Sequence, residues 1–292
     1  METYYGIVFA LTALFSWGFG EFYTQRAVRK TGVLITLFYI GLGGCIGLFP
    51  LVAHELSVLE SGSIYALTTL GIISFFASLF TTHALRLGKI SVVEPLAGLE
   101  LPLTVALSVI IGKEFLTMEQ LALIVMISIG IVFTVTLDFR HLHYHKRIFE
   151  KGVLLAALGA ICMAVTNYLV GISSQQISPL LTIWYIHSLV ALAAAVLLIA
   201  QGETRNTLKA LKRYTPLIGS IVILENFAWI SFATATTFIP ISIAVTVSEA
   251  YIALAAMLGL FYNREKIKRH QMWGILIAIV GIIALAFAVT AG

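Results

Sequence analysis

The stretch Ile275-Leu-Ile-Ala-Ile-Val280 decides the class of this protein, because it is apolar on every face of the helix that it would form. It lies within residues 270–289, a mostly apolar run of about the 20 residues that a helix needs to cross a bilayer. A membrane β-strand would instead alternate apolar and polar residues over about ten positions. The stretch therefore predicts a helix that faces lipid.

The composition of the whole chain agrees with this prediction. The chain has 292 residues, of which 60% are hydrophobic and 11% are charged. Soluble domains carry roughly a quarter of charged residues, so too few charges are present to cover a soluble globule. The two cysteines exclude a disulfide framework. No Lys or Arg occurs within the first 20 residues, so we expect a membrane span there and not a cleavable signal peptide.

Ten segments of similar length and hydropathy follow one another with short connections, which leaves no room for a soluble domain. The sequence thus predicts an all-α polytopic membrane protein with ten transmembrane helices. The predicted spans are 4–25, 32–53, 63–86, 90–111, 118–138, 151–172, 178–200, 215–238, 241–262 and 270–289.

The two halves of the chain resemble each other at a fixed offset. A shift of 151 places Ile90-Ser91 on Ile241-Ser242 and Glu114 on Glu265. Each half has five spans, an odd number, so the second half enters the membrane from the opposite side. We therefore predict two inverted five-helix repeats, a common plan of secondary transporters. Their predicted bounds are 4–138 and 151–289, with a linker at 139–150.

Short motifs in both halves carry a family resemblance. The motifs are Trp17-Gly18, Pro102 ahead of Gly112-x-Glu114, Glu265, and Gly274-x6-Gly281. With them, the chain resembles a member of the drug/metabolite transporter superfamily with two EamA domains. The resemblance implies a ten-helix, exporter-like fold with a central cavity and does not imply one substrate. The chain departs from the family pattern at Leu123, which replaces a glycine, and at Ala253, which replaces a proline.

The basic residues are distributed very unevenly. Seventeen of the 18 Lys and Arg residues fall at the connections after spans one, three, five, seven and nine, and Lys113 is the exception. Because basic loops are retained in the cytoplasm, this asymmetry predicts that both termini face outward. The family resemblance implies cytoplasmic termini instead. We favour the charge asymmetry, since it concerns this chain directly.

Five glutamates lie within the predicted spans, namely Glu21, Glu94, Glu100, Glu225 and Glu249. Inserting a charged acid near the bilayer centre costs about 2.5–3.5 kcal/mol of free energy on insertion scales. Acids at these positions therefore indicate a functional or structural role. The functional interpretation is that they bind a cation or exchange protons. The alternative is that they are protonated and hydrogen bonded between helices. Glu21 and Glu94 lie near helix ends, where the side chain can also reach water.

Six further polar or aromatic side chains in the spans are candidates for solute or proton binding: His187, Trp17, Trp229, Tyr251, Asn167 and Asn226. Trp229 lies four residues after Glu225 and hence on the same helix face, and an aromatic ring beside an acid suits an organic cation. The alternative for each of them is helix packing or helix bridging. His187 in particular is as well explained by a hydrogen bond within the core as by a proton relay.

These features predict a secondary active transporter of a small organic metabolite or drug-like solute. Proton coupling is one interpretation of the acids, and export follows the family resemblance. No Walker A pattern occurs, so neither ATP nor another cofactor is expected. The expected partners are the lipid bilayer, a solute and protons, without nucleic acid, in a prokaryotic plasma membrane.

Two alternative functions remain open. A membrane-embedded enzyme acting on a lipid-linked substrate would use a His–Glu pair, but the sequence shows no nucleophile elbow or HExxH motif. A passive channel would also tolerate an inverted repeat. Finally, His141, His143 and His145 alternate in the linker, where we expect a solvated basic segment and no metal site.

Overall fold

Ten α-helices run through the part of the chain that the computed structural model describes, which is residues 2–87, 97–135, 151–252, 254 and 268–291. Each of the ten predicted spans overlaps one of them, which confirms an all-α multi-pass fold. The helices are α1 (Glu2–Thr31), α2 (Val33–Val52), α3 (Ser61–Leu87), α5 (Glu100–Ile110), α6 (Met118–Val135), α7 (Lys151–Gln176), α8 (Pro179–Ala200), α9 (Thr204–Ala235), α10 (Ile241–Glu249) and α12 (Arg269–Ala291), with a short 3-10 helix at Glu55–Val58.

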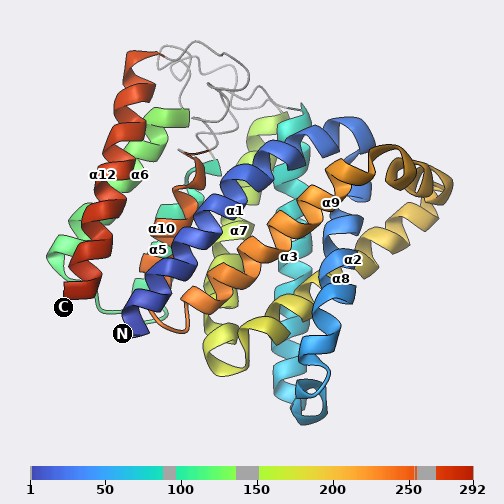
Figure 1. The fold of residues 1–292 in the computed structure, drawn as a ribbon, viewed down its shortest axis with the longest axis horizontal. Coiled ribbons are helices and arrows are strands. Elements are labelled where there is room, and N and C mark those ends of the chain that lie inside the picture. The colour runs from blue at the N-terminus through green and yellow to red at the C-terminus, as the bar shows by residue number, and fades with distance from the viewer. Residues whose placement is uncertain (1, 88–96, 136–150, 253, 255–267, 292) are drawn as a thin grey trace.

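Corresponding helices of the two halves run in opposite directions (Figure 1). The chain enters α1 at the end of the bundle that carries both termini, whereas α7 begins at the other end. The same reversal relates α6, which leaves the terminal end, to α12, which returns to it. The arrangement is the one that two inverted five-helix repeats produce.

Helix pairing follows the same symmetry. The most extensive contacts join α1 to α9, α3 to α7, α2 to α8, and α6 to α12. Exchanging the two halves converts the α1–α9 pair into the α7–α3 pair and leaves the other two pairs unchanged. α10, whose nine residues are all buried, lies at the centre and contacts α1, α5, α6, α7 and α9.

Glycines allow the backbones of two of these helix pairs to come into direct contact. A Cβ atom on Gly41 would lie 2.7 Å from the His187 carbonyl oxygen of α8, and one on Gly130 would lie 2.8 Å from the Ala278 nitrogen of α12. The Gly43-x3-Gly47 sequence has the small-residue spacing that is typical of close helix contacts. In the structure Gly43 packs against Val222 of α9, whereas Gly47 borders open space. The close approach of α2 to α8 therefore uses a different face from the one that the motif suggested.

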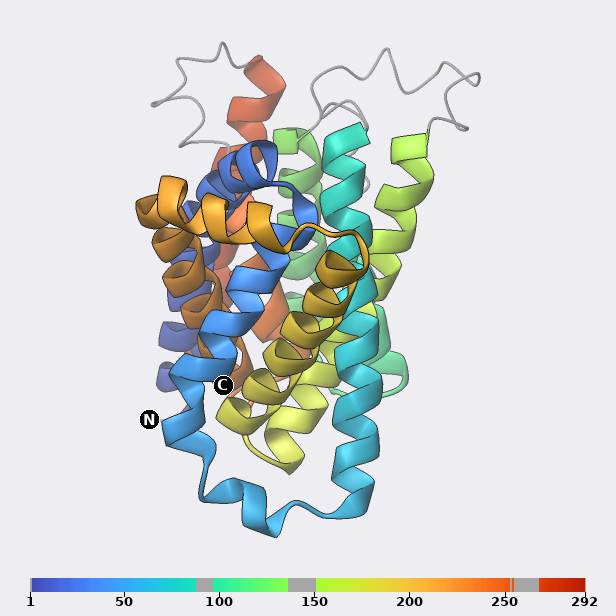
Figure 2. The same ribbon diagram turned by 90° about the vertical axis from the view of Figure 1, so that its right-hand side faces the viewer.

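One predicted connection is helical. α9 begins at Thr204, within the segment 201–214 that separates two predicted spans. The helix bends at Tyr214 (φ −123°, ψ 30°), two residues before Pro216. Proline removes one backbone hydrogen bond and its ring clashes with the carbonyl four residues earlier, so the long helix is divided there. Figure 2 shows the first part of α9 lying across the bundle, at the end opposite to the termini.

Candidate functional site

α5 and α10 come from corresponding parts of the two repeats. α5 begins, and α10 ends, at nearly the same position of its repeat. α5 begins at Glu100, directly after a turn at Gly98 and Leu99. α10 ends at Glu249, where Ala250 forms a turn with ψ −1°. The offset of 151 places Gly98 on Glu249, so both interruptions fall at the same place in their repeats. Interrupted membrane helices expose backbone ends that can serve a binding site.

The first group of site residues joins these two interruptions. Asn167 of α7 donates a hydrogen bond from Nδ2 to Oε1 of Glu100 at 2.7 Å and also bonds Glu249. The two carboxyl groups interact electrostatically with each other. Asn167 is buried, and its Oδ1 accepts no hydrogen bond from the described residues. We call Glu100, Asn167 and Glu249 the carboxyl pair site.

The second group lies between α1 and α9. Thr24 donates a hydrogen bond to Oε1 of Glu225 at 3.0 Å, and the side chain of Trp17 bonds the same carboxyl. Glu21, one turn from Trp17, interacts electrostatically with Glu225 and also with Glu100 and Glu249. Glu21 therefore links the second group to the carboxyl pair site, and four predicted acids form one cluster.

An aromatic group borders the Glu225 carboxyl. The rings of Trp17 and Trp229 meet edge to face with centroids 5.1 Å apart, and Tyr251 lies 5.9 Å from Trp17. Phe232 completes the group at 5.7 Å from Trp17. Sequence reasoning missed Phe232, although its spacing of three residues from Trp229 places the two rings on one helix face.

The cluster is largely shielded from solvent, with Glu225 and Glu249 buried and Glu21 and Glu100 partly exposed. Glu225 is 8% exposed, Glu249 is 4% exposed and Trp17 is 7% exposed. Buried carboxyl groups are unfavourable when charged and unpaired, so a cluster of four calls for protons, a bound cation or both. The arrangement is therefore chemically suited to exchange one positive charge for another.

His187 and Asn226 form a separate network. Nδ1 of His187 lies 2.6 Å from Oδ1 of Asn226, and Nδ2 of Asn226 donates to the carbonyl oxygens of Ile40 and Val222. Because the amide nitrogen is used as a donor, Oδ1 is the acceptor and Nδ1 of His187 carries the hydrogen. A side chain on Gly44 would collide with both groups. The contacts fit the helix-bridging alternative, since they tie α2, α8 and α9 together.

Some sequence candidates cannot be placed. Glu94, the three linker histidines, Glu265 and Ala253 lie outside the described residues. Among the residues that are described, no group of three His, Cys, Asp or Glu side chains has the arrangement of a metal site.

Glu114 makes a contact between the halves that was not predicted. It follows α5, and its Oε1 and Oε2 accept hydrogen bonds from the backbone nitrogens of Ile241 at 2.5 Å and Ser242 at 2.9 Å. These nitrogens belong to the first two residues of α10, so Glu114 caps a helix of the other half. The repeat itself carried the signal, because Glu114 and Ile241-Ser242 are both among the positions that match at the offset of 151.

Removing this cap should weaken the bundle. We expect Glu114→Ala to lower the free energy of unfolding by about 2 kcal/mol, because two backbone donors of α10 lose a charged acceptor. Glu114→Gln retains one acceptor, so its free energy of unfolding should lie between those of the wild type and Glu114→Ala. Denaturant titration of the purified protein in detergent measures the change. Glu119→Ala, at an exposed acid nearby, is the matched control, and an equal effect of both alanine variants would contradict the capping role.

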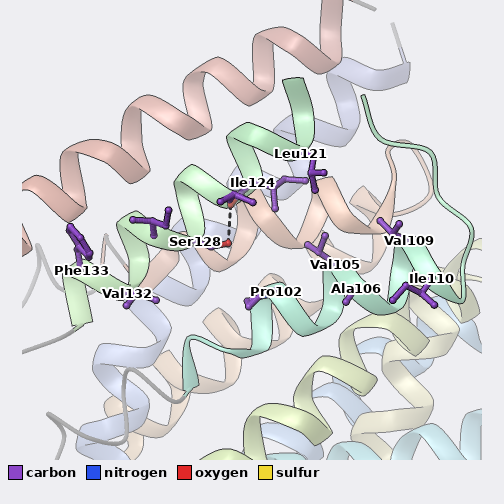
Figure 3. Close-up of a pocket in the computed structure, with 12 residues that line it drawn as sticks. Pro102, Val105, Ala106, Val109, Ile110, Leu121, Ile124, Ser128, Val132 and Phe133 are labelled. Carbon is purple, nitrogen blue, oxygen red and sulfur yellow. Dashed lines mark hydrogen bonds between the residues drawn. The ribbon is translucent and has the colours of Figure 1, made fainter. Parts of the chain in front are cut away.

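One apolar hollow has none of the acids in its lining. It has a volume of about 540 Å³ and lies between α5 and α6, lined by side chains such as Pro102, Val109 and Val125 (Figure 3). The hydroxyl of Ser128 donates to the Ile124 carbonyl oxygen of its own helix, as the dashed line shows. Several of its lining residues are exposed, so this hollow opens at the surface of the described part of the chain.

Two oppositely directed five-helix units, with interrupted helices that carry buried acids, have the architecture of secondary transporters. Comparison with known sequences gives the family. The chain matches the EamA-like transporter family over residues 4–136 and 150–287, and it belongs to that family. It is an integral multi-pass membrane protein and a transporter of the drug/metabolite type.

The chain is also similar to one further sequence and to one solved structure. The uncharacterized protein MJ1333.1 of Methanocaldococcus jannaschii is 30% identical over 128 residues, which is 43% of this chain and 93% of that protein. A solved crystal structure of another protein has a TM-score of 0.73 and covers 98% of this chain and 98% of that chain, at 16% identity. The second similarity supports the fold alone.

Proposed function

We propose that the protein is a proton-coupled exporter of a small organic cation, working by alternating access. One observation carries this proposal: the buried Glu225 carboxyl lies beside an aromatic group and interacts, through Glu21, with the carboxyls of Glu100 and Glu249. The export direction follows the family resemblance. The proposed repeats, 4–138 and 151–289, would exchange roles as access changes from one side to the other.

The Glu225 region favours an organic cation over other solutes. A carboxylate attracts the positive charge, and the rings of Trp17, Trp229 and Tyr251 offer apolar surface and cation–π contact to an organic body. An anion would be repelled by four acids. A neutral solute would leave the buried carboxylate without a counter-charge, which is costly in a dry site.

The carboxyl pair site is suited to hold the proton. Glu100 is the first residue of α5 and lies at the positive end of that helix dipole, whereas Glu249 is the last residue of α10 and lies at a negative end. A negative charge is therefore better placed on Glu100 and a proton on Glu249. A proton that enters this pair lowers the negative charge felt by the bound cation, and the cation is released.

A transport screen tests the proposal. Purified protein in liposomes with an imposed proton gradient is offered organic cations, anions and neutral metabolites, with Glu100→Gln, Glu225→Gln and Glu249→Gln in parallel. We expect saturable, gradient-driven accumulation of one or more cations, which the variants impair. Wild-type, proton-driven transport by all three variants would contradict the assignment. Movement without saturation or counterflow would indicate a channel, and accumulation of anions alone would exclude the cation site.

A further inference from the structure

The first part of α9, residues 204–213, has three distinct faces. Thr207 and Ala210 are buried against the bundle, and the Tyr39 hydroxyl donates a hydrogen bond to the Thr207 carbonyl oxygen at 2.8 Å. Leu208 and Leu211 point away from the bundle, with 62% and 37% of their surface exposed. The third face carries the basic side chains. A helix of this kind, with protein, apolar and basic faces, is suited to lie at a membrane surface.

The position of the helix fits such a surface. The bend at Tyr214 turns the chain from the membrane-crossing part of α9 into a segment that lies across the end of the bundle (Figure 2). Ala210 packs in a small apolar cluster with Ile35, Tyr39 and Ile218, which fixes the segment against α2. Its exposed leucines therefore meet the apolar edge of the bilayer while the basic side chains reach the headgroups.

The basic side chains gather where α9 meets the end of α1. The Lys30 Nζ atom lies 5.4 Å from the centre of the Tyr214 ring, and the Arg213 Cζ atom lies 5.5 Å from it. Lys209 and Lys212 are exposed on the same segment, and Arg29 is exposed on α1. Within the described residues none of these cations forms an ion pair with an acid. We call Arg29, Lys30, Lys209, Lys212 and Arg213 the basic patch.

We propose that the basic patch, together with Leu208 and Leu211, binds the headgroups of anionic phospholipids. Cations that have no acidic partner among the described residues, beside exposed leucines, combine the two attractions that hold a helix on a charged bilayer. The patch lies at the end opposite to the termini, which is the cytoplasmic end in the orientation that we propose from the charges. The proposal stands independently of the transported solute.

Lipid titration of the full-length protein tests this binding. Delipidated protein in neutral detergent is titrated with phosphatidylglycerol or phosphatidylcholine, and bound lipids are counted by native mass spectrometry. We expect tighter binding of phosphatidylglycerol, and K209Q/K212Q/R213Q should weaken it by about tenfold or more, since each basic residue near the surface adds to the attraction. K113Q, a single cation at the other end of the molecule, should leave it unchanged.

Three results would overturn the proposal. These are equal affinity of the wild type for the two lipids, unchanged phosphatidylglycerol binding by the triple variant, and displacement of the lipid by millimolar inorganic phosphate, which would indicate a site for free anions. Should the triple variant fail to fold by circular dichroism, the wild type in high salt replaces it. Salt should then weaken binding of phosphatidylglycerol and not of phosphatidylcholine, and an equal response of both lipids would contradict headgroup recognition.

Discussion

Glu249→Gln is expected to abolish the response of transport to a proton gradient while solute exchange continues. Glutamine has nearly the shape of a protonated glutamic acid and preserves the contact with Asn167, but it cannot release a proton. The accumulation ratio driven by the pH gradient should fall to about one, the value for passive equilibration, because no free energy is then coupled to the solute. Counterflow of labelled against unlabelled solute, measured without a pH gradient, should persist.

The control for this prediction is an acid outside the cluster. Glu60→Gln changes an exposed carboxyl next to the start of α3 and should keep gradient-driven accumulation at the wild-type level. If Glu249→Gln accumulates solute as the wild type does, Glu249 does not carry the coupled proton. A loss of both accumulation and counterflow would also contradict the assignment, since it would place Glu249 in solute binding.

Glu225→Gln is expected to weaken binding of an aromatic quaternary ammonium, such as benzyltrimethylammonium, by at least about thirtyfold. Removing one member of a buried, fully desolvated charge pair costs about 2–5 kcal/mol, which corresponds to this factor or more. The amide still accepts the hydrogen bond from Thr24, so the loss reports the missing charge and not a missing contact. Quenching of tryptophan fluorescence measures binding, because Trp17 and Trp229 adjoin the carboxyl.

A matched control separates local charge from total charge. Glu203→Gln, just before α9, removes the same charge far along the helix and should leave binding of the ammonium probe unchanged. A neutral probe of the same shape, neopentylbenzene, should not discriminate between wild type and Glu225→Gln. Equal weakening of both probes in Glu225→Gln would indicate a packing defect and would contradict the cation site.

Much of the fold could be predicted because the bilayer imposes it. Apolar runs of sufficient length located all ten helices, and the odd number of spans in each half indicated the inversion that Figure 1 displays. The segment 204–213 escaped this reasoning. Its helix is amphipathic and lies across the bundle, so hydropathy over a membrane-spanning length does not detect it. The contacts of Thr207 and Ala210 with Tyr39 are what hold it.

The candidate site was only partly predictable. Hydropathy placed Glu21, Glu100, Glu225 and Glu249 in the membrane without indicating which of them would meet. The repeat makes the helices of Glu100 and Glu249 equivalent, but the offset of 151 does not place one acid on the other. His187 and Glu114 form hydrogen bonds with residues that lie 39 and 127 positions away in the chain. No local sequence pattern encodes contacts of such separation.

The sequence by itself determined that the protein lies in a membrane, how many spans it has and that its halves are inverted. Each of these follows from the cost of exposing polar groups to lipid, and this cost can be added up along the chain without knowledge of tertiary contacts. Only the tertiary structure decided which side chains share a site. Asn167 joins Glu100 to Glu249, and Glu21 links them to Glu225, because α1, α5, α7, α9 and α10 come together around two interrupted helices. Short-range electrostatics and hydrogen bonding act only after packing has brought such distant residues into contact.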